Sequence, residues 1–246
     1  MDKMLYLAMT GAKQTMVAQS VNSNNLANVS TTGFKADLEQ FRSMQVVGEG
    51  IPSRIYSMTE RPGVDVTPGA INTTGRELDV AIKGAGWIAV QAPDGSEAYT
   101  RAGELHISSL GILETSSGYA VIGDGGPIVV PQAEKIEIGI DGSISIRPIG
   151  AGANEMAEIG RIKLVNPAAA NLSKGEDGLI RTRDGSTAEA DIDVQLVSGA
   201  VESSNVSAIK SMVKMIELSR QYEMQIKMMK TAEENDAATT QMMKMS

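Results

Sequence analysis

The chain reads Asn24-Asn25-Leu26-Ala27-Asn28-Val29-Ser30-Thr31-Thr32-Gly33-Phe34-Lys35 at the point where one sequence pattern ends and another begins. We call residues 24–35 the hinge segment. Upstream of it, apolar side chains recur at helical spacing, which predicts a long amphipathic helix. Within it, asparagine, serine and threonine side chains compete with helical hydrogen bonds, and Gly33 can adopt the left-handed conformation that turns the chain. The helix should therefore end near Ala27 or Asn28.

A second amphipathic pattern follows Gly199, beyond which the chain contains no glycine. Asn205 is a candidate N-cap, and apolar residues from Ile209 onward recur at helical spacing. A helix over residues 206–236 would be about 45 Å long and could not bury its stripe on a small β domain that has its own core. It needs a partner helix, and the N-terminal helix is the obvious candidate.

The middle of the chain has a different composition from the two ends. Of the 25 glycines, 23 lie in residues 46–199, whereas 13 of the 15 methionines lie outside this range. Residues 46–76 contain turn residues but no strong period, which suggests an extended, weakly structured connector. From Leu78 onward, short apolar runs are separated by Asp-Gly and similar pairs that suit tight turns with positive φ. This pattern predicts an antiparallel all-β domain. The predicted turns contain Gly95, Gly111, Gly142, Gly178 and Gly185.

Together these patterns predict an α+β protein. Its antiparallel all-β middle domain is accompanied by long N- and C-terminal helices that pair as a coiled-coil-like core. We expect three regions. Residues 1–33 with 200–246 form the helical core, residues 34–77 with 185–199 form the connector, and residues 78–184 form the β-rich outer domain.

Charge and composition exclude several classes of partner. The net charge is −8, and residues 46–199 carry 12 Lys and Arg against 21 Asp and Glu, which argues against nonspecific binding to nucleic acid or anionic lipid. The absence of cysteine excludes disulfides and thiolate chemistry. No run approaches the roughly 20 apolar residues of a membrane helix, and the N-terminus lacks the pattern of an ordinary secretory signal. We expect no nucleic-acid partner and no membrane insertion.

An enzyme is an alternative, because the acidic β region contains Asp79, Asp94, Glu104 and Asp141. Such carboxylates could serve a glycosidase or a metal-dependent hydrolase, but most of them lie in turn contexts where aspartate is expected from backbone geometry. His106 is the only histidine, which disfavours zinc sites and most serine triads. We therefore expect no catalytic residues, no cofactor and no metal site.

Three stretches of the chain match one set of signatures in order. The hinge segment fits the pattern Asn-Asn-Leu/Ile-Ala-Asn-x-x-Thr-x-Gly-Phe-Lys without departure. The second stretch comprises Leu78–Trp87, Tyr99–Gly103, Gly111–Leu113 and Gly118–Pro131, and the third comprises Gly199–Val206, Met215-Ile216 and Arg220–Glu223. Together they resemble the bacterial flagellar basal-body rod protein family, whose hinge pattern is shared with hook proteins. Trp87 stands where this family typically has Phe and keeps the apolar role.

The resemblance implies a structural subunit of the proximal rod, without catalysis. Such subunits leave through the flagellar type III export apparatus without a cleaved signal peptide. They then assemble helically through their terminal helices, with copies of themselves and other rod proteins, into the axle that transmits torque across the periplasm. The opening Leu5–Gln14 and the modest length resemble the proximal component. The distal paralogue commonly carries a Leu-Leu-Tyr segment and an insertion that are not visible between Phe34 and Val64.

Alternatives remain: a distal rod or hook-type paralogue, or, with less support, a β-rich secreted binding module or hydrolase. We expect the terminal helices to be largely disordered in the free subunit and to fold on assembly, because isolated helices gain little stability. The candidate assembly residues are Leu5, Ala12, Asn24, Asn25, Leu26, Ala27, Asn28, Thr31, Gly33, Phe34, Glu202, Ser204, Asn205, Val206, Ile209, Val213, Ile216, Arg220, Tyr222, Glu223 and Ile226.

Overall fold

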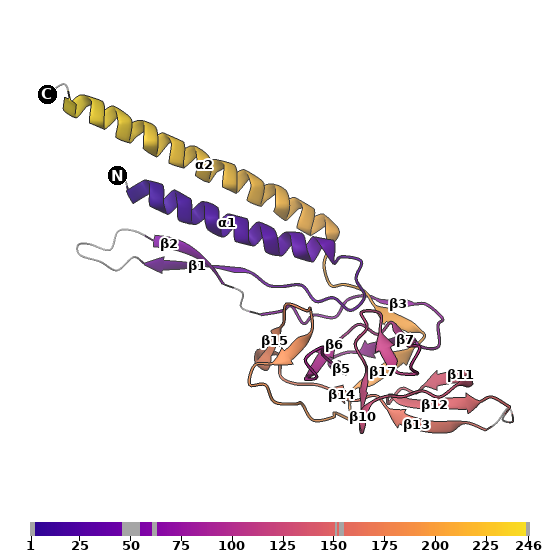
Figure 1. Ribbon diagram of the computed structural model, residues 1–246. Helices are drawn as coiled ribbons and strands as arrows, with labels where there is room; N and C mark the ends of the chain where they lie inside the picture. Colours follow the sequence, from indigo (N-terminus) through magenta and orange to yellow (C-terminus); the bar gives the residue numbers. More distant parts are fainter. Residues whose placement is uncertain (1–2, 46–54, 61–62, 151, 153–154, 245–246) are drawn as a thin grey trace. The chain divides into compact units, whose positions relative to one another are not determined.

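A computed structural model describes residues 3–45, 55–60, 63–150, 152 and 155–244 of the chain (Figure 1). The chain divides into two compact units. Unit 1 combines Met1–Ala27, Asp37–Pro62 and Ser207–Ser246, and unit 2 combines Asn28–Ala36 and Gly63–Val206. The chain therefore passes from one unit to the other four times. The three-region division expected from the sequence remains a prediction.

Unit 1 is built from two long helices and a β-hairpin. Its elements are α1 (Lys3–Ala27), β1 (Gln40–Gln45), β2 (Ile55–Glu60) and α2 (Ala208–Lys244). The hairpin strands pair antiparallel, and β2 contacts α1. The end of α1 at Ala27 confirms the predicted position, directly before the polar part of the hinge segment.

Helices α1 and α2 lie side by side and run antiparallel (Figure 1). Near the middle of α1, Gly11 faces Gln225, and near its end the side-chain amide of Asn22 donates to the carbonyl of Ser211 at 2.8 Å. At 37 residues, α2 is roughly 55 Å long. The predicted pairing of the terminal helices is therefore observed, whereas coiled-coil packing stays a prediction.

The seam between the helices is made mainly of small side chains. On α2 the buried residues are Ser211, Leu218 and Ala232. Small residues let helix axes approach closely, because the interaxial distance depends on the side chains at the contact. The buried residues of α1 are Ala8, Ala12, Thr15, Ala18, Val21 and Asn22.

The apolar stripe predicted to cover the partner helix faces away from this seam. Ile209 is 77% exposed and Ile216 is 56% exposed, and Val213 between them is also exposed. The prediction that these residues bury themselves against the N-terminal helix is wrong. Helical periodicity identifies the apolar face of a helix, but it does not identify the surface that covers this face.

The described regular secondary structure of unit 2 consists of β-strands and one short 3-10 helix, and every described strand pair in it is antiparallel, as predicted. Its largest sheet has the order β14-β5-β6-β16-β15, and a second has the order β11-β12-β13. Two-stranded pairs β17-β4, β18-β3, β7-β8 and β10-β9 complete the described part. The strands are β3 (Ile71–Thr73), β4 (Val80–Lys83), β5 (Trp87–Gln91), β6 (Glu97–Thr100), β7 (Leu105–Ile107), β8 (Leu113–Thr115), β9 (Ile122–Gly123), β10 (Gly126–Pro127), β11 (Ala133–Ile138), β12 (Ser143–Pro148), β13 (Ala157–Arg161), β14 (Leu164–Val165), β15 (Leu172–Lys174), β16 (Ile180–Thr182), β17 (Gln195–Ser198) and β18 (Ala200–Glu202), with a short 3-10 helix η1 (Ala169–Asn171).

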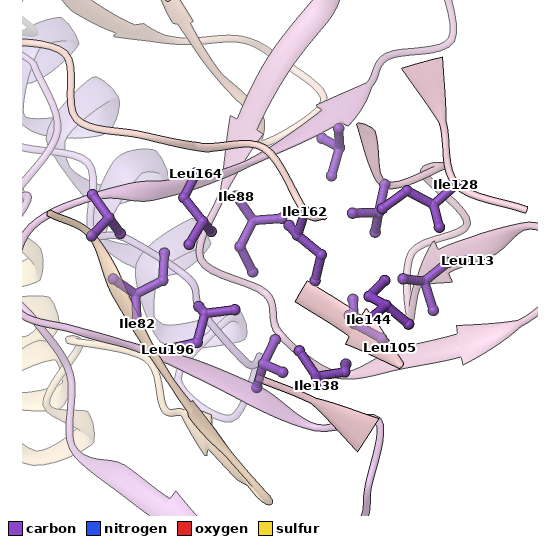
Figure 2. Packing of buried hydrophobic residues seen from close by; sticks show 14 of the residues in the cluster. Ile82, Ile88, Leu105, Leu113, Ile128, Ile138, Ile144, Ile162, Leu164 and Leu196 are labelled. Carbon is purple, nitrogen blue, oxygen red and sulfur yellow. The ribbon is translucent and has the colours of Figure 1, made fainter. Parts of the chain in front are cut away.

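The core of unit 2 is one aliphatic cluster shared by several sheets (Figure 2). Ile88 of β5, Leu105 of β7, Ile144 of β12 and Leu196 of β17 are fully buried and meet in this cluster. A smaller cluster around Trp87 is separate. Because valine, isoleucine and leucine fill this core, scarce aromatic residues do not prevent close packing.

The turns of unit 2 follow the sequence prediction, but the connector does not. Gly95, Gly111, Gly142, Gly178 and Gly185 all have positive φ. Residues 46–76, which were expected to be weakly structured, contain strands β2 and β3, so that description is wrong for these two segments. Residues 46–54 and 61–62 lie outside the described part. β3 is exposed along its length and therefore shows no alternating pattern. None of the described helices is both long and apolar enough to cross a membrane.

Candidate functional site

The three stretches that carry the family resemblance meet at the side chain of Glu202 in unit 2. Glu202 is buried at the end of β18, and its Oε1 accepts hydrogen bonds from Lys35 Nζ at 2.5 Å and from the Gly69 backbone N–H at 2.8 Å. Its Oε2 accepts from Arg101 Nη1 at 2.8 Å. Its carbonyl accepts from the Gly33 N–H at 2.7 Å. We call Lys35, Arg101 and Glu202 the Glu202 cluster.

The Glu202 cluster holds two cations and one carboxylate, all almost fully buried. Burial lowers the pKa of Lys35, and its hydrogen bond to Glu202 only partly offsets this effect. Burial alone would raise the pKa of Glu202, but the hydrogen bonds from Lys35, Arg101 and the Gly69 N–H, together with the Arg101 charge, hold this pKa below its ordinary value. Glu202 is therefore the group on which both cations depend.

Arg101 links the cluster to the sheet around Trp87. Its Nη2 donates to the Gly84 carbonyl at 2.7 Å, and its guanidinium lies 5.3 Å from the centroid of the Trp87 ring. Its Nε is buried without a hydrogen-bond partner among the residues that the structure describes. The arginine is therefore held by charge, by one carbonyl and by a cation–π contact.

Gly33 is required for two reasons, of which the sequence indicated one. Its φ of 68° confirms the predicted left-handed conformation. In addition, a Cβ at this position would lie 2.2 Å from the carbonyl carbon of Arg101 and 2.3 Å from the Ala102 nitrogen. A side chain therefore cannot fit without displacement of the Arg101–Ala102 backbone.

Phe34 and Lys35 are held from a second side by Lys174 of β15. Lys174 Nζ donates to the Lys35 carbonyl at 2.8 Å and lies 3.9 Å from the centroid of the Phe34 ring. This contact joins the hinge segment to the edge of the five-stranded sheet.

Asn205 ties three backbone segments of unit 2 together. Its Oδ1 accepts from the Ala36 N–H at 2.8 Å, and its Nδ2 donates to the carbonyls of Asp65 at 2.8 Å and Thr67 at 3.2 Å. Its own N–H donates to the Phe34 carbonyl at 3.3 Å. The segment that follows α1 and the segment that precedes α2 are thus hydrogen-bonded to each other within unit 2.

The predicted N-cap role of Asn205 is wrong. Helix α2 begins at Ala208, and the hydroxyl of the preceding Ser207 accepts from the Lys210 N–H at 3.5 Å. Ser207 therefore occupies the capping position, and the Asn205 side chain is committed to the backbone segments described above.

The remaining asparagines of the hinge segment act locally. In unit 1, the Asn25 side chain donates to the Asp37 carbonyl at 3.0 Å and accepts from the Asp37 N–H at 2.9 Å. Asn28 Oδ1 accepts from the Thr31 hydroxyl at 3.1 Å. Of the others, Asn24, Ala27 and Thr31 are exposed, while Leu26 and Asn28 are half-buried.

The helical candidates divide between the seam and the outer surface. Ala12 is buried, whereas Leu5 and Tyr222 are half-buried. Before α2, Ser204 is buried and accepts from the Val206 N–H at 3.2 Å. The exposed candidates are Ile209, Val213, Ile216, Arg220, Glu223 and Ile226.

Sequence reasoning did not select Lys35, Arg101 or Lys174 as site residues. Lys35 and Arg101 lie inside the matched stretches, each near a glycine and an aromatic residue. This sequence context is the feature from which they could have been selected. Their pairing was not readable, because 167 residues separate Lys35 from Glu202 and 101 separate Arg101 from it.

The carboxylates considered for catalysis lie in structural settings. Asp94 and Asp141 accept hydrogen bonds from the side chains and backbone N–H groups of Ser96 and Ser143, which lowers the pKa of both. Asp79 accepts from the Thr74 hydroxyl at 2.6 Å. A general acid needs a raised pKa, so Asp94 and Asp141 are poorly suited to that role.

Comparison with known families matches three parts of the chain. Residues 5–35 match the flagella basal body rod protein family, and residues 81–146 match the flagellar hook protein FlgE/F/G D1 domain. Residues 197–242 match the flagellar basal body rod FlgEFG protein C-terminal family. The first and third matches contain Gly33, Lys35 and Glu202, and the second contains Arg101.

Similar proteins match over nearly the whole chain. The flagellar basal-body rod protein FlgF of Escherichia coli strain K12 is 42% identical, and FlgF of Salmonella typhimurium strain LT2 is 40% identical, each with 100% of both chains covered. FlgG of Bacillus subtilis strain 168 is 31% identical over 95% of this chain and 96% of that protein. The higher identity to these two FlgF proteins agrees with the predicted resemblance to the proximal component. The chain belongs to the family of flagellar basal-body rod proteins.

Proposed function

We propose that this chain is a structural subunit of the flagellar basal-body rod that assembles through the outward faces of α1 and α2. Its family and its likeness to FlgF proteins support the role of a rod subunit. The proposal also places the chain in the proximal rod, where subunits assemble helically and transmit torque across the periplasm. Export by the flagellar type III apparatus belongs to the same proposal.

The proposed mode of assembly is supported by exposed apolar side chains on α1 and α2. On α1, Met9 and Met16 lie two turns apart and are exposed, with Met16 58% accessible. On α2, Ile209, Val213 and Ile216 follow one another at helical spacing and are also exposed. Single exposed apolar residues are normal, but stripes of them at helical spacing mark a surface that another protein covers.

The proposed occupants of this surface are copies of the same chain and other rod proteins. Each large aliphatic side chain that becomes fully buried contributes about 1.5–3 kcal/mol. Several such side chains on each helix are needed to offset the roughly 4–15 kcal/mol of lost freedom on association. Two exposed stripes on one subunit satisfy this requirement and allow contact with more than one neighbour.

We propose no catalytic activity, cofactor or metal for this chain. Its named relatives are rod proteins, and the carboxylates that could have served an enzyme are occupied in turns or ion pairs. A hollow of about 620 Å³ lined by Asp184, Glu189, Asp191 and Asp193 exists in unit 2, but nothing in its chemistry favours a particular ligand.

The experiment compares Ile216→Asp with a matched control, Ile192→Asp. Both isoleucines are exposed, Ile216 on the α2 stripe and Ile192 in unit 2. A cell that lacks the native protein would receive each variant, with motility and the presence of rods in isolated basal bodies as readouts. We expect Ile216→Asp to abolish both and Ile192→Asp to preserve both, with unfolding of the monomers unchanged. Normal rods with Ile216→Asp would refute assembly through this face.

A further inference from the structure

Residues Asn28–Ala36 are a short segment of unit 2 that lies in the sequence between two segments of unit 1, Met1–Ala27 and Asp37–Pro62. We call this segment the excursion. Ordering such a segment costs conformational entropy, so specific contacts must hold it. Those contacts lie at the end of the excursion, from Gly33 to Ala36.

The excursion is held by backbone and side-chain contacts within unit 2. The Gly33 N–H donates to the Glu202 carbonyl, and the Ala36 N–H donates to Asn205 Oδ1. Between them, the Lys35 ammonium reaches into the interior and contacts Glu202 Oε1 and the Thr67 carbonyl, the latter at 2.8 Å. Lys35 is thus the one charged side chain of the excursion, and its charge is satisfied by residues far away in the sequence.

The Glu202 cluster contains two positive charges and one negative charge. Removing a positive charge and removing the negative charge should therefore affect stability differently. If Lys35 loses its charge, Arg101 and Glu202 remain as a balanced pair at 2.8 Å. If Glu202 loses its charge, both buried cations lose the carboxylate that they contact. Removal of the cluster's carboxylate charge should therefore disturb all of unit 2, whereas removal of Lys35 should release the excursion alone.

We propose that the Glu202 cluster is an internal lock that fixes the Asn28–Ala36 excursion within the free subunit. The lock keeps the segment that leaves α1 beside the segment that enters α2, and it needs no neighbouring subunit. The hinge segment is then an intramolecular anchor, in addition to any contact that it makes in the assembled rod. This inference is independent of the proposed function, because it concerns the monomer.

The lock is tested in the purified full-length monomer by two readouts. Hydrogen exchange of peptides that cover residues 28–36 reports the excursion itself. Fluorescence of Trp87, the single tryptophan, reports unfolding of unit 2, because Arg101 lies over its ring. The variants are Lys35→Met and Glu202→Gln. The matched control is Lys135→Met, because Lys135 and Glu137 also lie 2.5 Å apart but are 41% and 55% exposed.

We expect Lys35→Met to lower protection of the excursion by about tenfold or more, while the Trp87 unfolding midpoint shifts by only a few degrees. Glu202→Gln should lower that midpoint by roughly 10 °C. Lys135→Met should change neither readout, because exposed pairs contribute little. The proposal is overturned if the excursion exchanges freely in the wild-type monomer, or if Lys35→Met leaves its protection unchanged. Either result is obtained without reference to rod assembly.

Discussion

The two units of this chain bury their apolar residues to very different extents. Unit 2 encloses a cluster of valine, isoleucine and leucine side chains from several sheets, with Ile88 and Ile144 fully buried. In unit 1, the 37-residue α2 buries Ser211, Leu218 and Ala232 and leaves Ile209, Val213 and Ile216 exposed. Unit 2 therefore has the core of an independent domain, whereas unit 1 leaves the apolar surface on which the proposed assembly depends.

Gly33→Val should give the largest effect, because Gly33 belongs to the self-contained unit. The variant combines a strained φ with a clash against the Arg101 backbone, and it should lower the free energy of unfolding by roughly 4 kcal/mol or more. Urea unfolding followed by Trp87 fluorescence measures this change.

Gly75→Val is the matched control, because Gly75 has a similar φ of 74° and a Cβ there meets no atom within 4 Å. Its loss should be about 1–2 kcal/mol. Equal losses in the two variants would show that the close approach to Arg101 is unimportant.

A pair of isoleucine variants sharpens the contrast between the units. Ile88→Ala removes a fully buried side chain and should cost about 3 kcal/mol of unfolding free energy. Ile209→Ala, at an exposed position, should change monomer stability by no more than about 0.5 kcal/mol but should weaken assembly. Chemical denaturation of the monomers and sedimentation of assembled material measure the two effects. A large stability loss in Ile209→Ala would mean that its face is already covered in the monomer.

Acid should weaken unit 2 through Glu202. The pKa of this carboxyl is held below its ordinary 4.5, so the stability it contributes is fully present above pH 4.5 and is lost as the pH falls through the folded-state value. Unfolding midpoints at several acidic pH values measure this loss.

The pKa values of turn aspartates such as Asp94 and Asp141 are also lowered, so they too contribute to acid sensitivity. The difference between the acid-unfolding curves of the wild type and Glu202→Gln gives the contribution of Glu202. The charged groups in contact with the Glu202 carboxylate are Lys35 and Arg101. Parallel curves for the wild type and the variant would contradict a role for Glu202 in acid sensitivity.

The smallest effect is expected from removing both helices of the free subunit. Because the seam consists mainly of alanine, serine and threonine, it contributes little hydrophobic stabilisation, and we expect α1 and α2 to become ordered mainly on assembly. Circular dichroism of the full-length monomer should therefore change little when residues 1–27 and 208–246 are deleted. A strong helical signal that disappears on truncation would contradict this expectation.

Local features of the fold were predictable from the sequence, because they depend on neighbouring residues. The end of α1 at Ala27 follows from the side chains of the hinge segment, and the turn at Gly142 follows from an Asp-Gly pair. Strand β6 gives no alternating pattern, because Glu97–Thr100 is short and its two middle residues are both buried. Strand β3 was missed because it is exposed throughout.

Some residues of the candidate site were predictable from the sequence, but the hydrogen bonds that join them were not. Gly33 and Glu202 were selected from the sequence, yet their hydrogen bond joins residues from opposite ends of the chain. Asn205 was assigned to a helix cap because its sequence context fits one, and only the fold reveals the backbone segments that occupy its side chain. Tertiary pairing of this kind leaves no periodic signal in one sequence.

The excursion of Asn28–Ala36 into unit 2 has a practical consequence for protein engineering. A β unit transplanted as the continuous stretch Gly63–Val206 would lack Gly33 and Lys35 and would leave the Glu202 carboxylate with only its contacts to Arg101 and Gly69. Chimeras between rod paralogues should therefore exchange Asn28–Ala36 together with Gly63–Val206, as a single module in two pieces.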